Sequence, residues 1–366
     1  MKKELSALDI HYLVAEMQCL VDARIDKAYT DNDGVMLVFY VTGKGERFFK
    51  AFLSGFAYVS DNKGNYAPAG KLCMVLRKYL SGGRLRKVIQ KEFERIIEFQ
   101  IDTKEGLFIF IVELFSGGNF ILCKEDYTII AANKFKKYSQ RAVRGGVIYD
   151  YPKKEIDLKT AYIEDFSQIL DNCGKENIVK GLAIGLGLGG IYSEEACLIA
   201  GIDKNKEHIN GNEMQKLFGA VKALLSKELY PVVYTGTDVC PFLLEKYNTI
   251  LYEKKDFFSM AIEEYYLNYF HLKQKEKSPT EVEREKISLR LSRQREDILA
   301  LLTEAEEEQQ KGEAIYNKYQ LVDEVISSIK KAREKYSWKE IKEKIKGHSV
   351  VKEVNSAEGK VVIEIK

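Results

Sequence analysis

The sequence predicts an α+β protein with more than one domain, and three observations support this class. The chain has 366 residues, and a single compact core rarely grows beyond about 250–300 residues before a chain divides into domains. Strand-like runs punctuated by Gly, Asn and Asp fill residues 1–155. From residue 256 onward the sequence is helical in pattern and highly charged. An N-terminal antiparallel β-sandwich or barrel-like domain followed by helical segments is therefore expected.

Residues 1–155 are expected to form the β-rich domain. Ser6 is a suitable N-cap for a first helix, and Asp9, three residues on, stands near the positive end of that helix. A second helix is predicted at residues 69–80. Strands are predicted at 34–43, 47–53, 56–60, 85–101, 107–115, 119–124 and 128–131.

A glycine-rich turn distinguishes the next segment, 156–230, which we expect to be helical. Gly187, Gly189 and Gly190 lie between helix-like runs at 177–184 and 193–200, which is the order of a helix-hairpin-helix element. Glycines let a turn approach a phosphate closely, and the following helix offers it free N–H groups. A tight turn that binds no ligand has the same spacing, so both interpretations stay open. A dinucleotide-binding fold is not expected, because no strand precedes the glycines.

The rest of the chain divides into three predicted parts. Residues 231–270 contain short strand-like pieces and a helix that should pack back on the core. Residues 271–346 are predicted to be a coiled-coil arm, and 347–366 a β-hairpin-like segment. The next helical run within the arm, 313–335, is shorter than the first, so we expect the returning arm to be missing and the open seam to allow self-association. The seam consists of Ile287, Leu291, Gln294, Ile298, Leu301 and Ala305.

Composition excludes several classes of protein. The formal net charge is +2, so nucleic-acid binding has to come from local basic patches and not from the field of the whole chain. The six cysteines form no C-x-x-C pair and the four histidines no zinc spacing, so we expect reduced core thiols, no metal and no cofactor. No run reaches the roughly 18 apolar residues of a membrane helix, and the N-terminus lacks a signal-peptide pattern. The sequence therefore favours a cytoplasmic protein without membrane association.

Two stretches concentrate basic residues. Arg77 and Lys78 lie in the helix predicted at 69–80, where a solvated helix face is an equally good interpretation. The second stretch, 133–154, mixes bases with Phe and Tyr, which suits an RNA backbone with splayed bases. A polar loop between strands would also have this composition. The basic residues of the second stretch are Lys134, Lys136, Lys137, Arg141, Arg144, Lys153 and Lys154.

Segment 113–119 is predicted to be a hairpin turn, because Gly117 and Gly118 can supply positive φ. In an alternative interpretation, Glu113 and Asn119 face a ligand cleft. The sequence pattern by itself does not separate the two.

Several segments, in this order, resemble the NFACT family, also known as fibronectin-binding protein A-like. They are Ser6–Asp9, Leu76–Leu80, Glu94–Ile96, Glu113–Leu122, Gly189–Glu195, Tyr316–Tyr319 and Ser337–Ile341. The resemblance implies an N-terminal domain related in fold to that of formamidopyrimidine DNA glycosylases, then a helix-hairpin-helix segment and a coiled-coil arm. It also implies that the family's C-terminal RNA-binding domain is missing from this chain.

The resemblance further implies a role in ribosome-associated quality control. Members bind large ribosomal subunits stalled with peptidyl-tRNA and recruit tRNA, so that the nascent chain is extended without mRNA. The implied partners are the large ribosomal subunit, tRNA and the stalled nascent chain. Peptidyl transfer belongs to the ribosome, so the chain is expected to be no enzyme and to have no catalytic residue.

Family residues implicated in tRNA handling fall on Asp9 and on an acid–Arg pair at Glu94 and Arg95. The acid is Glu here and Asp in the family, which keeps the charge and lengthens the reach by one methylene. Carboxylates do not hold phosphates, so Asp9 and Glu94 would orient Arg95 or accept hydrogen bonds from a base edge or a ribose. The predicted tRNA-binding set also includes Arg77, Lys78, Glu113 and Asn119, and the predicted RNA-binding set is Lys134, Lys136, Lys137, Arg141, Arg144, Gly187, Gly189 and Gly190.

The sequence disfavours two other functions. A DNA glycosylase of related fold uses an N-terminal Pro amine, whereas this chain begins Met1-Lys2-Lys3-Glu4. A fibronectin-binding adhesin would need secretion, which the N-terminus and the thiol usage disfavour.

Overall fold

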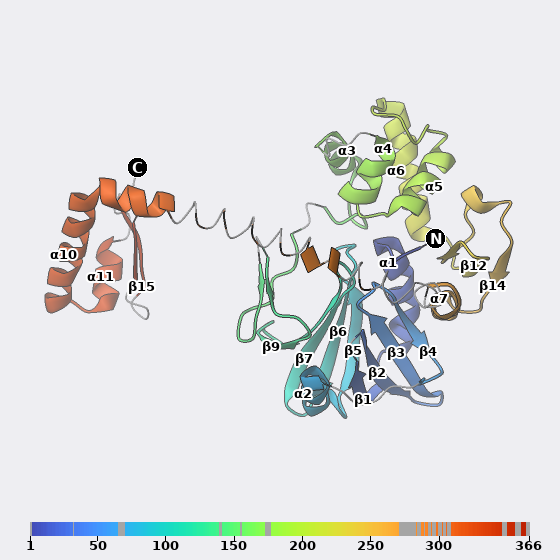
Figure 1. Cartoon of the computed structure of the whole chain (residues 1–366), viewed down its shortest axis with the longest axis horizontal. Helices are drawn as coiled ribbons and strands as arrows, with labels where there is room; N and C mark the ends of the chain where they lie inside the picture. The colour runs from blue at the N-terminus through green and yellow to red at the C-terminus, as the bar shows by residue number, and fades with distance from the viewer. Residues whose placement is uncertain are drawn as a thin grey trace. The chain divides into compact units, whose positions relative to one another are not determined.

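The computed structural model describes residues 2–31, 33–64, 70–138, 141–153, 156–172, 177–270, 309–345, 350–355 and 360–363, with single helical positions between 283 and 305. They belong to two compact units, Met1–Lys277 and Ser278–Lys366 (Figure 1). None of the described helices has the length and the apolar composition needed to cross a membrane.

One nine-stranded antiparallel sheet dominates the first unit, with the order β4-β3-β2-β1-β5-β6-β7-β8-β9. Neighbours in the chain are neighbours in the sheet, except that α2 (Gly70–Leu80) follows β4 and returns the chain to pair β5 with β1. The predicted α+β class with a large antiparallel sheet is thus confirmed. The strands are β1 Arg24–Thr30, β2 Gly34–Val41, β3 Gly45–Phe52, β4 Ala57–Ser60, β5 Arg84–Gln90, β6 Ile96–Thr103, β7 Gly106–Glu113, β8 Asn119–Lys124 and β9 Ile129–Ala132.

The sheet folds over itself and encloses a core between its two halves. Phe49 in β3 and Phe99 in β6 are separated by three strands in the sheet order, which in a flat sheet would put β3 and β6 about 19 Å apart. Their ring centroids lie 4.8 Å apart, and Phe39 in β2 also stacks on Phe99 at 6.3 Å. A single curled sheet therefore produces the sandwich-like core.

Two predictions for this region were wrong in detail. The run 85–101 is not one strand, because the chain turns between β5 and β6, where Glu92 and Phe93 have φ of 46° and 49°. Residues other than Gly seldom adopt positive φ, so this turn carries no local signal. Strand β1 was not predicted, because three of its seven residues are charged and its apolar and polar residues do not alternate cleanly.

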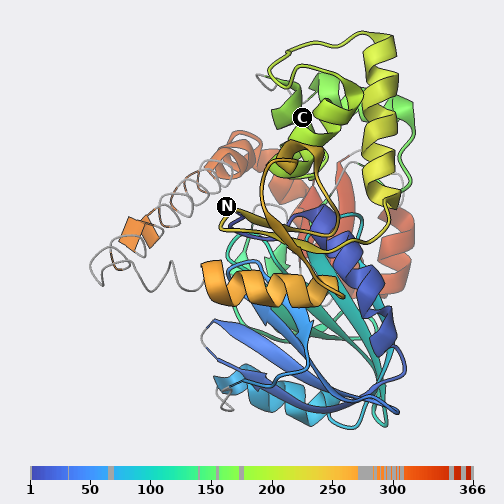
Figure 2. The ribbon, with the colours of Figure 1, turned by 90° about the vertical axis from the view of Figure 1, so that its right-hand side faces the viewer.

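The first helix, α1 (Ala7–Glu16), begins as predicted. Ser6 accepts a hydrogen bond from the Asp9 backbone, and the Asp9 carboxylate accepts one from the Ser6 backbone, which is a capping box. Figure 2 shows α1 between the sheet and the helices of residues 163–226.

The remaining elements of the first unit are short. The helical segment contains α3 (Ile163–Asn172), α4 (Ile178–Lys180), the π-helical turn η2 (Gly181–Gly185), α5 (Gly190–Ala200) and α6 (Gly211–Ser226). A three-stranded sheet follows, β13 (Asp238–Cys240), β12 (Val232–Tyr234) and β14 (Tyr252–Lys254), and then α7 (Phe258–Tyr265). The other short elements are η1 (Met17–Leu20), β10 (Lys136–Lys137), β11 (Ala142–Val143), η3 (Glu245–Tyr247) and η4 (Tyr266–Phe270).

One hydrophobic core extends from Leu5 to Tyr266 and includes side chains of the large sheet, the helical segment and the small sheet. The domain boundaries predicted at 155 and 230 stay predictions.

The second unit contains α10 (Tyr319–Lys335), α11 (Trp338–Ile345) and the antiparallel pair β15 (Val351–Asn355) and β16 (Lys360–Ile363). Five residues of the predicted seam are helical and exposed, namely Ile287, Leu291, Gln294, Ile298 and Ala305. Leu301 lies outside the described residues, and pairing of the arm stays a prediction.

Candidate functional site

Two predicted site segments that lie far apart in the sequence meet at one cleft of the first unit. The cleft has a volume of about 510 Å³. Its walls come from the segment before α1, the β5–β6 turn and the glycine-rich turn before α5. Of the predicted residues, it is lined by Glu94, Arg95, Gly187, Gly189 and Gly190.

The glycine-rich turn packs directly against the start of α1. Gly189 has φ of 82°, and a Cβ at this position would lie 3.0 Å from the Cβ of Ser6. Both the backbone conformation and the close approach therefore require glycine. As a result the first residues of α1 and of α5 lie at the same cleft. No side chain among those described caps α5, so its first N–H groups are open to a ligand.

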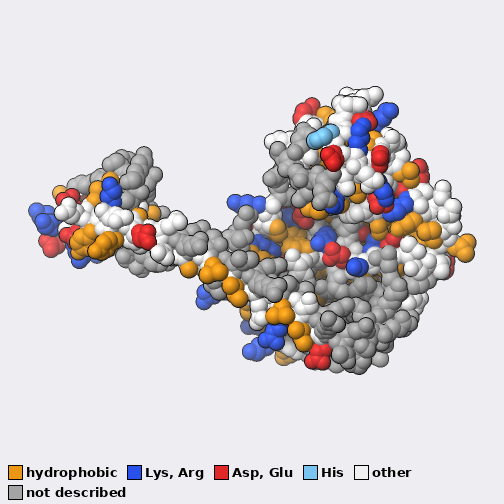
Figure 3. Space-filling view, turned by 45° about the horizontal axis from the view of Figure 1, so that its top comes forward, with side chains coloured by type: hydrophobic (Ala, Val, Ile, Leu, Met, Phe, Trp, Pro, Cys, Tyr) orange, Lys and Arg blue, Asp and Glu red, His pale blue; other side chains and the backbone are white. Residues whose placement is uncertain are grey.

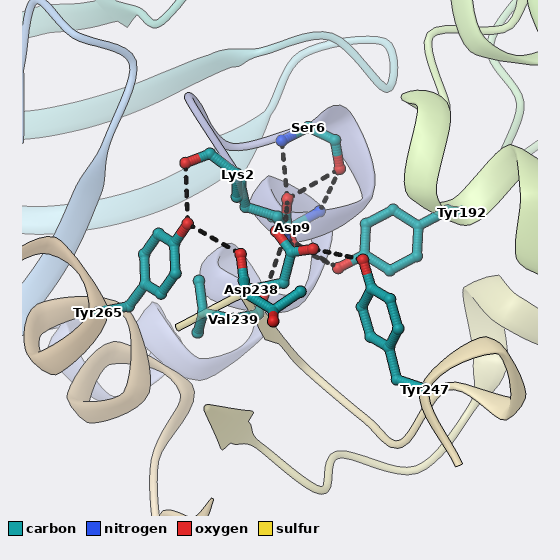
Figure 4. A network of polar contacts seen from close by, with 9 residues as sticks. Lys2, Ser6, Asp9, Tyr192, Asp238, Val239, Tyr247 and Tyr265 are labelled. Carbon is teal, nitrogen blue, oxygen red and sulfur yellow. Dashed lines mark hydrogen bonds and ion pairs between the residues drawn. The ribbon is translucent and has the colours of Figure 1, made fainter. Parts of the chain in front are cut away.

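Asp9 lies beneath the cleft and does not line it. Its carboxylate is fully buried and accepts hydrogen bonds from the Tyr192 hydroxyl at 2.5 Å and from the Ser6 backbone N–H at 2.7 Å. Lys2 Nζ forms an ion pair with it at 2.8 Å (Figure 4). Asp9 thus ties the N-terminal segment, α1 and α5 together.

Lys2 was not foreseen from the sequence, where no periodicity connects it to Asp9. Its side chain is buried, and Nζ also donates to the Val239 carbonyl at 2.6 Å. Burial by itself lowers the pKa of Lys2, but the carboxylate of Asp9, with smaller contributions from Cys240 and Asp238, raises it above the ordinary value on balance. Burial, and then the charge of Asp9, raise the pKa of Tyr192.

The buried polar network continues into the small sheet and α7. The Tyr265 hydroxyl donates to the Lys2 carbonyl at 3.0 Å, and the Tyr247 hydroxyl to Asp238 Oδ2 at 2.5 Å (Figure 4). Asp238 Oδ1 is buried and has no hydrogen-bond partner among the described residues. These contacts join the floor of the cleft to elements late in the first unit.

At the cleft, Arg95 forms an ion pair with a solvent-exposed carboxylate. Its Nη1 lies 2.5 Å from Glu4 Oε1, and the side chains of Arg95 and Glu4 are 25% and 50% exposed. Such an exposed pair contributes only about 0–1 kcal/mol, so a phosphate can replace Glu4 at the guanidinium. Glu94 is half-buried beside it.

The basic residues of α2 lie elsewhere. Arg77 Nε donates to the Ala28 carbonyl at 2.7 Å, and its guanidinium lies 4.8 Å from the Tyr29 ring. Lys78 is exposed beside Tyr79. Figure 1 shows α2 at the end of the large sheet away from α1, so these residues form no common surface with the cleft.

Glu113 and Asn119 also lie away from the cleft, and both are buried. Glu113 Oε1 accepts from Arg141 Nη1 at 2.6 Å and from the Tyr149 hydroxyl at 2.7 Å. Asn119 bonds both backbone groups of Lys134, each at 2.9 Å. These two side chains therefore hold the basic loop against the sheet.

The predicted RNA-binding residues of 133–154 form a small structured loop with one hairpin, β10 and β11. Lys134 Nζ donates to the Gly117 carbonyl at 2.6 Å, and Lys136 lies 5.0 Å from the Tyr138 ring. Lys137 and Arg144 are exposed. Lys154 lies outside the described residues.

Over the first unit, Lys and Arg side chains alternate with Asp and Glu on the face drawn in Figure 3, in keeping with a net charge of +2. Within the described part of the chain, no group of three His, Cys, Asp or Glu side chains could hold a metal ion.

A family model described as NFACT N-terminal and middle domains matches residues 6–361. The archaeal Rqc2 homolog aRqcH of Methanocaldococcus jannaschii is 30% identical over 401 residues, covering 100% of this chain and 59% of the relative. The human ribosome quality control complex subunit NEMF is 23% identical, covering 93% of this chain and 35% of its own length. The chain thus spans less than two thirds of the length of either relative.

Two solved structures share the fold of the first unit. The fibrinogen binding protein from Staphylococcus aureus has a TM-score of 0.60 at 20% identity and covers 71% of this chain and 98% of its own. The N-terminal part of the fibronectin/fibrinogen-binding protein from Streptococcus suis has a TM-score of 0.59 at 20% identity. It covers 72% of this chain and 100% of its own. At this identity the likeness concerns the fold alone.

Proposed function

The chain belongs to the NFACT family, and we propose that it is a ribosome-associated quality-control factor. In this proposal it binds the large ribosomal subunit carrying peptidyl-tRNA and recruits tRNA, so that a stalled nascent chain is extended at its C-terminus without mRNA. The archaeal relative, an Rqc2 homolog, and the human relative, a ribosome quality control complex subunit, support the assignment to ribosome quality control. The site of action is then the cytoplasm.

The observation that carries the proposal is the meeting of Arg95 with the N-terminus of α5 at one cleft. A guanidinium and uncapped helix N–H groups together suit one RNA phosphate. Glu94, at the same cleft, can accept a hydrogen bond from a base edge or a ribose hydroxyl. In this arrangement the cleft binds the tRNA backbone through a phosphate, and the Glu94 carboxylate contacts a neighbouring base or ribose.

Asp9 acts in this proposal by positioning. It is fully buried and bonded to Lys2, Ser6 and Tyr192, so it fixes α5 against α1 and thereby shapes the cleft. Peptidyl transfer remains the chemistry of the ribosome, and this chain contributes only the placement of tRNA.

The test is a titration of tRNA at fixed salt with Arg95→Ala and a matched control, Arg24→Ala. Arg24 is an exposed arginine of β1 outside the cleft, so the control removes the same charge elsewhere. We expect Arg95→Ala to weaken binding and to reduce co-sedimentation with tRNA-loaded large subunits, while Arg24→Ala binds as the wild type does. Equal affinities of the two variants would reject the cleft as the tRNA site.

The two bacterial structures are named for binding fibrinogen or fibronectin, but their likeness to this chain is one of fold. A likeness of fold transfers neither an adhesive nor a glycosylase activity to this chain. Neither is proposed for this chain.

A further inference from the structure

A second pocket lies beneath the basic loop and shares no residue with the cleft. It has a volume of about 220 Å³, smaller than the roughly 300–1,000 Å³ that encloses a drug-sized ligand. Its size suits one ring system. The aromatic part of its lining is Phe115, Tyr138 and Tyr151, and its polar part includes Arg141, Asp150 and Lys153.

Arg141 is fixed in this pocket before any ligand arrives. Its side chain is only 7% exposed, and Nη1 donates to Glu113 and, at 3.2 Å, to the Tyr149 hydroxyl. Its guanidinium carbon lies 4.7 Å from the Tyr138 ring centroid. None of the residues described around it accepts a hydrogen bond from Nε or Nη2, so donors remain for a ligand.

The walls of the pocket are anchored from below. The Tyr151 hydroxyl donates to Glu98, a buried carboxylate of β6. Asn119 bonds both backbone groups of Lys134, at the start of the loop. A pocket with walls held in this way loses little conformational freedom when it binds.

The surface around the pocket is strongly basic for a chain of net charge +2. Residues 133–153 contain six Lys and Arg and a single acid, Asp150. Lys137, Arg144 and Lys153 are exposed. Cations beside an aromatic pocket are the arrangement by which proteins hold single-stranded nucleic acid, with phosphates outside and a base on the rings.

We propose that this pocket binds one unpaired nucleotide of RNA. The base packs against the Arg141 guanidinium and the two rings around it, Phe115 at 5.8 Å and Tyr138 at 4.7 Å, and the flanking phosphates lie on the exposed cations. An acidic peptide would use these charges but would leave the aromatic walls without a planar partner. The inference rests on the proposed function only in that the ligand is RNA, and its site is independent of the cleft.

The test uses the whole chain and a fluorescently labelled, short single-stranded RNA of mixed sequence at fixed salt. Tyr138→Ala should weaken binding by about fivefold or more, because base–aromatic stacking contributes this much per base. Tyr138→Phe should bind within about twofold of the wild type. Tyr162→Ala, which removes a 74% exposed ring outside the pocket, is the matched control and should have no effect.

A second variant, which changes a charge at the rim of the pocket, tests the proposal even if Tyr138→Ala does not fold. Lys153→Glu, at the rim of the pocket, should weaken binding more than Lys104→Glu, an equal charge change on an exposed turn outside it. Wild-type affinity of Tyr138→Ala, equal binding of a duplex of the same sequence, or full competition by an acidic peptide would each overturn the proposal. Arg95→Ala should leave this affinity unchanged, so failure of the cleft and failure of the pocket are distinguishable.

Discussion

The Tyr192 hydroxyl lies 2.5 Å from Oδ1 of Asp9, and this single bond joins α5 to α1 across 183 positions of sequence. Lys2 closes the same cluster with an ion pair to Asp9. Because the glycine-rich turn comes just before α5, the cluster also sets where that turn meets the start of α1. The shape of the cleft therefore depends on Asp9, a buried residue that does not line it.

Asp9→Ala should destabilise the protein by about 3–5 kcal/mol, because it leaves the Lys2 ammonium buried without its carboxylate. Urea denaturation measures this free energy of unfolding. Asp61→Ala is the control, since Asp61 forms an ion pair with Arg47 but is 81% exposed, and its loss should cost less than about 1 kcal/mol. Similar unfolding midpoints for the two variants would show that the buried pair is dispensable.

Glu4→Gln should strengthen tRNA binding by about two- to fivefold, because it releases Arg95 from its exposed partner. Stability should change by less than about 1 kcal/mol. Glu46→Gln removes the same charge from an exposed position of β3 and should not change the affinity. An equal gain from both variants would assign the effect to net charge and not to Arg95.

Gly189→Ala should destabilise the protein by at least about 1–2 kcal/mol, because its φ of 82° is unfavourable for a residue with a Cβ. The new Cβ would also press on Ser6 and displace the turn, so tRNA affinity should fall as well. Gly211→Ala, outside the cleft, has no neighbour within 4 Å of its Cβ and an ordinary φ, which makes it the matched control. Thermal unfolding measures the stability of both variants, and a titration measures their tRNA affinity. Equal stability and equal affinity of the two variants would contradict this account.

The stability of the protein should decrease as the pH falls below about 6.5, the ordinary pKa of a His side chain. Burial lowers the pKa of His11, so the folded state favours its neutral form. Because the pKa of His11 is lower in the folded state than in the unfolded state, the group contributes its full stability at pH values above the unfolded-state pKa. That contribution is lost as the pH falls toward the folded-state pKa. In His11→Gln the decrease between pH 7 and pH 5 should be smaller, whereas replacing the exposed His208 with Gln should leave it unchanged.

Much of the local structure was predictable because its signals lie within a few residues. The Ser6 capping box, the strand at 119–124 and the β15–β16 hairpin follow from capping chemistry and alternation. Glu92 and Phe93 were not predictable as a turn, because their positive φ comes from tertiary packing around Phe93, which is fully buried.

The candidate site was predictable in its parts but not in its assembly. Glu94, Arg95 and the turn glycines were singled out separately, and the structure unites them at one cleft. Glu113 and Asn119 were also predicted as site residues from the sequence, yet in the structure they hold a loop in place. Residue type alone does not distinguish these outcomes, because a carboxylate or an amide suits a ligand and a buried partner equally well.

By itself the sequence determined the α+β class, most but not all of the strands of the large sheet and the segments that resemble the NFACT family. Only the tertiary structure decided that Arg95 lines the cleft, that Asp9 lies beneath it and that Lys2 neutralises Asp9. The physical reason is that burial and partnership depend on which distant segments pack together, and such long-range packing is a property of the whole core.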